Sequence, residues 1–379
     1  MTQATHDTIP DPNAEARATS IVLLAVAAMG IGLVQVYSAT ANRPLFEGGR
    51  PTLGHPFLTQ AIWVLLSLTS IAVVARLSSR TLERLAPFAL LGAVVLLIGL
   101  QIPGVARPIN GATRWFRVGP LSFQPSELAK VGLVLFLAWF LARGADPLRS
   151  FLRGFLPTVA VIAVVVGLVA MQPDFGTSLF LAATGGVLML LAGARVLHLV
   201  PMIIAAGGSF TMFMIDRFDH VQARIDAFRD PMSNYNTQHS LLALGSGGVT
   251  GVGLGNGRQK LDYLPENASD FIFSILGEEL GLIGAGLVLA LYVVFLWKGA
   301  SIALHARDTF GFYLASGATL LVVLQAMIHI AVATASAPTK GIPLPFISLG
   351  GSNLLCLSIG VGLLACVARQ GEVRVPRTT

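Results

Sequence analysis

Asp270 is the acidic side chain of this sequence that is best placed to do chemistry. It closes a long polar interruption and stands directly before the apolar run 271–297. A charged side chain costs roughly 2.5 to 3.5 kcal/mol at the centre of a membrane helix and less near the interface, so acids at such borders usually face protein or water and often serve function. We therefore take Asp270 as the first candidate for a catalytic residue.

Glu127 and Lys130 are the second candidates, in the motif QPSELAK at the entrance to the apolar run 128–142. Their three-residue spacing puts them on one helix face, where they can pair. Such a pair either neutralises two charges that enter the membrane or lines a polar cavity beside Asp270. Gln124 and Ser126 of the same motif are further candidates for binding a substrate.

Asp174 and Lys340 lie in two further polar clusters. Asp174 follows Pro173 in a short turn, where Asp commonly caps the next helix and can also add negative potential to a cavity. Lys340 lies in TKGIPLPFISLGG, whose two prolines and three glycines are incompatible with a regular helix. This stretch is either a broken segment that lines a wet cavity or an ordinary outer loop.

The remaining polar patterns indicate packing more than chemistry. Glu278 and Glu279 lie inside an apolar run, and we expect them to pair with a neighbouring helix. The run GSGGVTGVGLGNG lacks the preceding strand and the Lys-Ser/Thr pair of a phosphate loop. The seven histidines are dispersed and show no metal-ligand spacing. The sequence therefore leaves a metal site unknown.

The composition is that of a membrane protein. Hydrophobic residues make up 54% and charged residues 12% of the 379 residues, whereas a soluble chain carries about 25% charged residues. The mean hydropathy is +0.74. Although the net charge is +6, the basic residues are scattered singly through short loops, so nothing indicates a nucleic-acid partner.

The apolar runs predict an all-α polytopic membrane protein with about ten transmembrane helices of roughly 20 residues each. Residues 1–17 are expected to form a disordered cytoplasmic tail, residues 18–368 the transmembrane domain, and residues 369–379 a second cytoplasmic tail. One large extracytoplasmic loop, 216–269, separates the seventh and eighth helices. The predicted runs are 21–37, 57–74, 85–102, 128–142, 155–171, 177–192, 196–215, 271–297, 310–335 and 354–367.

The orientation follows from the basic residues of the short loops, which favour an N-in, C-in topology in the membrane. Long loops translocate largely regardless of charge, so the basic loop 216–269 is not counted. Every polar cluster that looks specific follows an odd-numbered helix: QPSELAK follows the third, QPDFGTS the fifth, the Asp270 loop the seventh and the Lys340 stretch the ninth. We therefore expect Asp270, Asp174, Lys340 and the QPSELAK motif to meet on one face, the extracytoplasmic one.

Long motifs of this chain resemble one known family. QPSELAK, QPDFGTS, the block SLLALGSGGVTGVGLGNGRQKLDYLPENASDFIFSILGEELGLIG and PTKGIPLPFISLGGSNLL are similar to the signature blocks of the SEDS proteins, for shape, elongation, division and sporulation. The resemblance extends from the first helix to the last. The GEELGLIG block and the TKG before PLPFIS look more like the division branch, FtsW, than the elongation branch, RodA.

The resemblance implies a function and a partner. SEDS proteins are peptidoglycan glycosyltransferases of the bacterial cytoplasmic membrane, with about ten spans, that polymerise lipid II beside a class B penicillin-binding protein. The resemblance also implies that the essential acid is Asp270 and that the pair of the fourth helix is Glu127 and Lys130. Two departures stand out: Ala268 and Ser269 replace a common His-Thr before the acid, and Leu349 replaces a common Tyr. The first alters the neighbours of Asp270.

A carboxylate at position 270 could take the proton of a sugar hydroxyl as it attacks the next unit, which is typically worth 10²- to 10⁴-fold. The departing pyrophosphate needs charge stabilisation, for which Arg114, Lys130, Lys340 or a divalent cation such as Mg or Mn are candidates. Two alternatives stay open. The protein could be a lipid II flippase or transporter with Glu127, Asp174 and Asp270 along its path, or a non-catalytic scaffold for a synthase.

Overall fold

The computed structural model describes residues 7–41, 45–47, 50–51, 55–102, 114–118, 121–144, 148, 150–195, 232, 234–261 and 263–375. Most of these residues are helical. The helices are α1 (Ala14–Ala39), α2 (Pro56–Val74), α3 (Ser79–Gly99), α4 (Pro125–Leu141), the π-helical turn η1 (Phe151–Phe155), α5 (Leu156–Ala170), α6 (Phe175–Leu191), α9 (Tyr235–Gly247), α10 (Ile272–Leu304), α11 (Thr309–Ala333) and α12 (Gly351–Arg369).

The strands form three short antiparallel pairs within the described residues. Strand β1 (Asp7–Pro10) pairs with β6 (Glu372–Val375), β2 (Phe46–Glu47) with β3 (Arg50–Pro51), and β4 (Phe116–Val118) with β5 (Leu121–Phe123). Each joins neighbouring segments at a helix end. None builds a sheet that could carry the fold.

Seven of the described helices are long and apolar enough to cross a membrane, with η1 and α5 counted as one, and α6 is a shorter apolar helix. This confirms an all-α, multi-pass membrane protein. Every predicted apolar run coincides with a helix except 196–215, which lies outside the described residues. Large apolar side chains such as Leu65, Leu179 and Leu287 are exposed on the outer faces, where lipid is the solvent.

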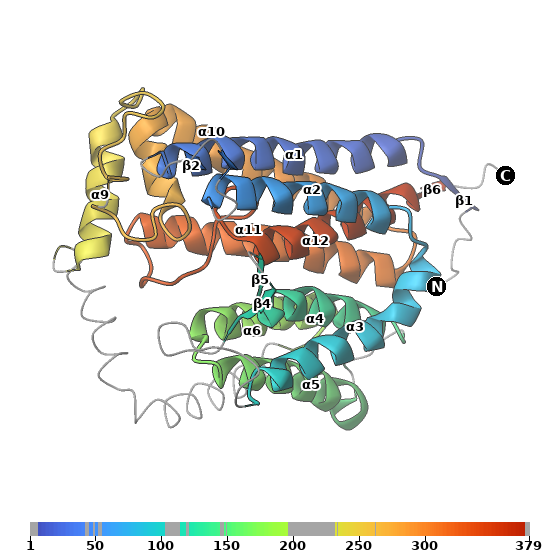
Figure 1. Ribbon diagram of the computed structural model, residues 1–379. Coiled ribbons are helices and arrows are strands. Elements are labelled where there is room, and N and C mark those ends of the chain that lie inside the picture. Colours follow the sequence, from blue (N-terminus) through green and yellow to red (C-terminus); the bar gives the residue numbers. More distant parts are fainter. Residues whose placement is uncertain are drawn as a thin grey trace.

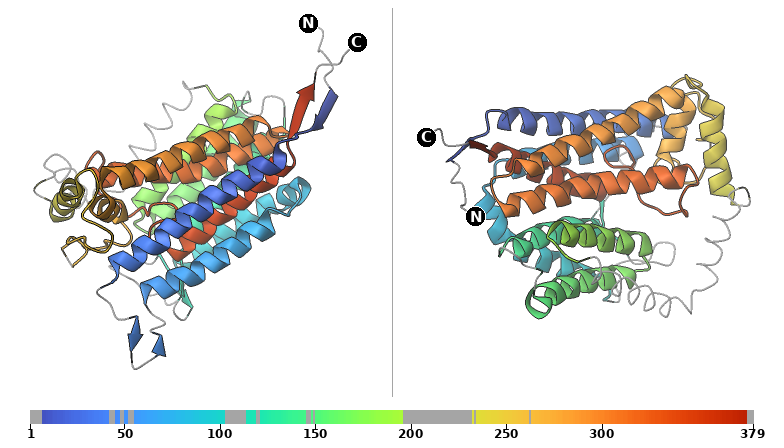
Figure 2. Two further views of the ribbon diagram at one scale, coloured as in Figure 1. Left: turned by 90° about the horizontal axis from the view of Figure 1, so that it is seen from above. Right: turned by 180° about the vertical axis from the view of Figure 1, so that it is seen from behind.

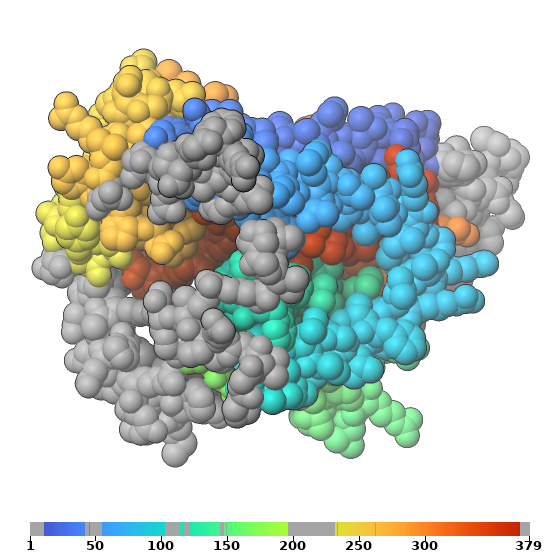
Figure 3. Space-filling view, in the orientation of Figure 1, coloured from blue at the N-terminus to red at the C-terminus, as the bar shows by residue number. Residues whose placement is uncertain are grey.

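The helices lie roughly side by side, with α9 running crosswise at one end of the bundle (Figure 1). Strands β1 and β6 pair at the other end (Figure 2). Helix α12 is buried along most of its length. In the space-filling view its red residues appear between α2 and the teal residues of α4 (Figure 3).

The prediction of a disordered tail over residues 1–17 is wrong for its described part. Helix α1 begins at Ala14, and Asp7–Pro10 pairs with the C-terminal strand. The Asp11 carboxylate accepts a hydrogen bond from the Asn13 amide at 2.9 Å and pairs with the Arg17 guanidinium. These local polar contacts order a segment that has no apolar periodicity. The described part of the loop predicted over 216–269 contains one regular helix, α9.

Helix α10 is longer than predicted and is broken at Gly281, where φ is +66°. A backbone break leaves amides and carbonyls without helical partners, and the segment 248–253 supplies them. The Leu282 and Ile283 amides donate to the Gly248 and Val249 carbonyls at 2.9 and 3.2 Å. On the other side of the break, the Glu278 and Glu279 carbonyls both accept from this segment, at 3.1 Å. The segment 248–253 thus completes the helix that follows Asp270.

Candidate functional site

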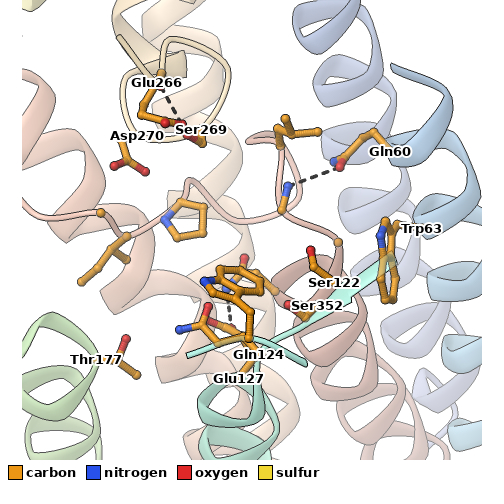
Figure 4. A pocket seen from close by; sticks show the side chains of 18 of the residues that line it. Gln60, Trp63, Ser122, Gln124, Glu127, Thr177, Glu266, Ser269, Asp270 and Ser352 are labelled. Atoms are coloured by element: carbon orange, nitrogen blue, oxygen red, sulfur yellow. Dashed lines mark hydrogen bonds between the residues drawn. The ribbon is translucent and has the colours of Figure 1, made fainter. Parts of the chain in front are cut away.

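A cavity of about 490 Å³ opens where the N-terminal ends of α2, α4, α6 and α12 meet the segment before α10 (Figure 4). Its lining includes Gln124, Glu127, Lys130, Asp270 and Gly341. These residues come from motifs far apart in the chain, so the predicted meeting of the polar clusters at one face is confirmed for the QPSELAK motif, the Asp270 segment and the 339–351 stretch.

Asp270 stands two residues before α10 and is half-buried at the cavity. Its amide donates to the Glu266 carbonyl at 2.9 Å, which closes a turn that brings two carboxylates to the same lining. Burial raises the pKa of the Asp270 carboxyl from 3.8 to about 7, the charge of Glu266 adds to the rise, and hydrogen bonding by Ser269 opposes it. A carboxyl with this pKa can gain and lose a proton near neutral pH.

The segment 336–350 is irregular, as its prolines and glycines predict. It holds the two residues before Asp270 in place through hydrogen bonds. The Ser348 hydroxyl donates to the Ser269 carbonyl at 2.7 Å, and the Leu349 amide donates to the Ala268 carbonyl at 2.8 Å. A Cβ atom on Gly341 would lie 3.0 Å from Asp270 Oδ2. A side chain at position 341 would therefore press on the carboxylate, which glycine avoids.

Side chains of α2 and α11 hydrogen-bond to the backbone of segment 336–350. The Gln325 side-chain amide donates to the Pro343 carbonyl at 2.7 Å, and His329 Nδ1 lies 2.8 Å from the Ile342 carbonyl. Because a carbonyl only accepts, Nδ1 carries the proton. From α2, Gln60 donates to the Ser348 carbonyl at 3.2 Å. These three side chains were not predicted from the sequence, where their only signal is that each is a polar group inside an apolar run.

Glu127 and Lys130 form the predicted ion pair, with Lys130 Nζ 2.8 Å from Glu127 Oε2. Both are buried. The pair belongs to a wider network: the Asn353 amide donates to Glu127 Oε2 at 2.7 Å, and Lys130 donates to Gln325 Oε1 at 3.0 Å. The network ties α4, α11 and α12 together at the cavity wall, so the two charges are neutralised and also line the cavity.

Arg114 and Asp174 hold the turn between α5 and α6. The Arg114 guanidinium donates to the Gln172 carbonyl at 2.8 Å and to the Pro173 carbonyl. Asp174 caps α6 by accepting from the Thr177 amide at 3.2 Å, which confirms the capping prediction, and its second oxygen accepts from the Gln124 amide at 3.2 Å. The described lining of the cavity includes Gln124 but neither Arg114 nor Asp174.

Ser126 and Lys340 lie close to the cavity but outside its described lining. The Ser126 hydroxyl is buried and has no hydrogen-bond partner among the described residues. The Lys340 side chain packs beside Gly176 in the first turn of α6, where a Cβ on Gly176 would lie 3.5 Å from Lys340 Cδ. The structure thus places Ser126 and Lys340 beside residues that line the cavity, but not in the lining itself.

Glu278 and Glu279 pair with neighbours, as expected, although the neighbours belong to the loop more than to another helix. Glu278 accepts from the backbone amides of Arg258 and Gln259 at 2.8 and 3.2 Å. Glu279 pairs with Lys260 at 2.7 Å and accepts from Ser38 of α1. Both carboxylates are buried, and they hold the segment 258–260 against α10 and α1.

A dedicated metal cage is not found in the described part of the chain, where no three His, Cys, Asp or Glu side chains lie together. Mg²⁺ bound mainly by the phosphate oxygens of a substrate needs only one or two carboxylates from the protein. A divalent cation therefore stays a prediction from the sequence.

Comparison with known proteins gives consistent matches over most of the chain. The model of the FtsW, RodA and SpoVE family, described as "Cell cycle protein", matches residues 18–372. A Geobacter sulfurreducens protein named "Probable peptidoglycan glycosyltransferase FtsW" is 37% identical over 92% of this chain and 94% of its own length. "Stage V sporulation protein E" of Bacillus subtilis is 35% identical over 93% and 97%.

Solved structures are similar over the same extent. One, described as "Structural coordination of polymerization and crosslinking by a peptidoglycan synthase complex", has a TM-score of 0.75 and 28% identity, covering 93% of this chain and 97% of that one. The Thermus thermophilus rod shape determining protein RodA has a TM-score of 0.68 and 28% identity, with coverage of 92% and 96%. The similarity therefore includes the segments that build the cavity.

Proposed function

Since this chain belongs to the FtsW, RodA and SpoVE family of cell cycle proteins, the SEDS family, we infer that it is a peptidoglycan glycosyltransferase of the bacterial cytoplasmic membrane. Its relatives named FtsW agree with the expected division branch. We propose that its substrate is lipid II, a disaccharide-peptide joined to a polyprenol through pyrophosphate. A cavity at the end of a helical bundle suits a substrate whose tail stays in lipid and whose sugar lies at the interface.

Asp270 is the general base of the proposed reaction. A sugar hydroxyl of one unit attacks the anomeric carbon of another; its proton passes to the Asp270 carboxylate, and the bond from that carbon to the pyrophosphate oxygen breaks, with the electron pair leaving on the pyrophosphate. The observation that carries this assignment is the half-buried position of Asp270 at the cavity together with its pKa of about 7. Such a base is partly ionised at working pH and still strong enough to accept a proton.

The other candidate residues divide by position. Gln124, Glu127 and Lys130 line the cavity and are proposed to contact the substrate. Arg114, Ser126, Asp174 and Lys340 stay predictions as substrate-binding residues, and the contacts of Arg114 and Asp174 support a role in shaping the α5–α6 turn.

We propose an N-in, C-in orientation. The two chain ends pair with each other through β1 and β6. The cavity is lined from the N-terminal ends of α2 and α12, whereas β6 follows the C-terminal end of α12. The chain ends and the cavity therefore lie on opposite sides of the membrane, and the short basic loops place the chain ends inside.

We also propose a class B penicillin-binding protein as the partner. A solved relative is described as part of a complex that coordinates polymerization and crosslinking. Glycan strands made at this cavity need a transpeptidase to join their peptides. Such a partner supplies the second activity.

Reconstitution in liposomes with fluorescent lipid II tests the proposed function against its two alternatives. We expect glycan polymer from the wild-type protein and none from Asp270→Asn, whose amide cannot accept the proton. Movement of monomer across the bilayer without polymer would indicate a flippase, and neither result would indicate a scaffold. Polymer made by Asp270→Asn would remove the base assignment while leaving the glycosyltransferase intact.

A further inference from the structure

The first turn of α12 forms one wall of the cavity, with Gly350, Gly351, Ser352 and Asn353 all in the lining. Its N-cap residue, Gly350, has no side chain that could accept hydrogen bonds from the first amides. These amides have no carbonyl partner within the helix. Together with the aligned peptide dipoles, they make a helix N-terminus a favourable place for an anion.

Ser352 adds a second donor at the same place. Its side chain is 1% exposed, and its hydroxyl has no hydrogen-bond partner among the described residues. A buried hydroxyl without a partner is costly, so its presence in a cavity lining points to a ligand that completes it. Ser352 and Asp270 reach the cavity from different elements, α12 and the segment before α10 (Figure 4).

The position of this turn is fixed by close packing. A Cβ atom on Gly351 would lie 2.0 Å from Trp63 Nε1, so the indole of α2 rests directly on the backbone of α12. The Gly350 amide donates to Gln60 Oε1 at 3.3 Å. Two side chains of α2 therefore hold the backbone of the turn rigidly, as a preorganised binding site requires.

The described lining has one cationic side chain, and it is already paired, so an anion in the cavity needs hydrogen-bond donors such as those of this turn. The charged side chains of the described lining are Glu127, Lys130, Glu266 and Asp270. The Lys130 ammonium already serves Glu127 and Gln325. The backbone amides of α12 and the Ser352 hydroxyl are neutral donors that need no counter-charge, and other neutral donors such as Gln124 and Trp115 belong to the same lining.

We propose that the first turn of α12, with the amides of Gly351 and Ser352 and the Ser352 hydroxyl, binds the pyrophosphate of the lipid-linked sugar. This inference rests on the proposed function. When the bond between the anomeric carbon and the pyrophosphate oxygen breaks, the electron pair stays on that oxygen, and the α12 donors stabilise the charge through hydrogen bonds. The attacking hydroxyl gives its proton to Asp270, on another wall of the cavity.

Binding of a fluorescent polyprenyl pyrophosphate without sugar to the full-length protein in detergent tests the site directly. Ser352→Ala should weaken binding at least about tenfold, the loss expected for one hydrogen bond to a charged oxygen. Ser358→Ala is the matched control, because Ser358 is a buried, unpartnered serine further along the same helix and outside the described lining. It should bind as tightly as wild type. A polyprenol without phosphate should bind both variants equally.

Ser352→Cys keeps the test independent of folding. The thiol is close to the hydroxyl in size and is a much weaker hydrogen-bond donor, so the Tm should be maintained while the affinity for the pyrophosphate falls. Equal affinity of wild type, Ser352→Ala and Ser352→Cys for the pyrophosphate probe would overturn the assignment. If wild type still polymerised lipid II in that case, only the α12 site would be wrong. Wild type without polymer would refute the proposed function, and the probe comparison would still decide the site.

Discussion

Polymerisation by this protein should depend steeply on pH because its proposed base is held at an unusual pKa. With a pKa of about 7, the ionised fraction of Asp270 rises from about 0.1 at pH 6 to about 0.9 at pH 8, so the rate should rise roughly tenfold over this range. An aspartate at its ordinary pKa of 3.8 would be fully ionised throughout and would give a flat profile. The measurement is the initial rate of glycan synthesis at saturating lipid II.

Glu266→Gln is the perturbation that tests the cause. It removes the negative charge that helps to raise the pKa of Asp270, so the midpoint of the profile should move to lower pH and the rate at pH 6 should approach that at pH 8. Glu83→Gln, which makes the same charge change on α3 at the other end of the bundle, should leave the midpoint unchanged. A flat wild-type profile, or a midpoint that Glu266→Gln does not lower, would refute the reasoning.

Three further predictions concern stability and positioning. The folded state raises the pKa of Asp270 and so binds its proton more tightly than the unfolded state does. The stability that this proton contributes is complete below the ordinary pKa and is lost as pH rises through about 7. Asp270→Asn should therefore raise the Tm at pH 8 more than at pH 5, and an equal change at both would contradict the burial of the acid. His329→Leu removes the hydrogen bond to the Ile342 carbonyl and should lower the polymerisation rate. His329→Asn keeps a donor near the position of Nδ1 and should retain most of the polymerisation rate. Equal losses of rate in the two variants would exclude a positioning role. Glu127→Ala should reduce polymerisation nearly as much as loss of Asp270. Glu278→Ala should act mainly by lowering the Tm, because Glu278 binds the backbone amides of residues 258 and 259. The opposite order, measured by rate and thermal unfolding, would reverse these assignments.

The features that could be predicted from the sequence are those with a local signature. The position of Asp270 at a cavity could be predicted because an acid directly before an apolar run is costly to expose to lipid. The Glu127–Lys130 pair could be predicted because a three-residue spacing on a helix brings side chains together. Alternation of sides then brought separated motifs to one face. The Asp174 cap follows from the preference of Asp for the residue before a helix.

The features that could not be predicted depend on tertiary contacts. Gln60 lies in one apolar run, and Gln325 and His329 lie in another. Only the folded segment 336–350 supplies the carbonyls that they bind. Order in the polar N-terminal tail arises from the Asp11–Arg17 pair and from a strand more than 350 residues away. Neither produces a hydrophobic period.

The break at Gly281 makes the loop segment 248–253 part of a membrane helix. Residues before and after the break hydrogen-bond to the same loop segment. Four backbone hydrogen bonds therefore fix which loop residue lies beside which helix residue. An extra residue inserted between positions 248 and 253 would shift this register and carry Glu278 and Glu279 away from their partners. Loops are usually where a chain tolerates changes of length; this one has the length restrictions of a helix.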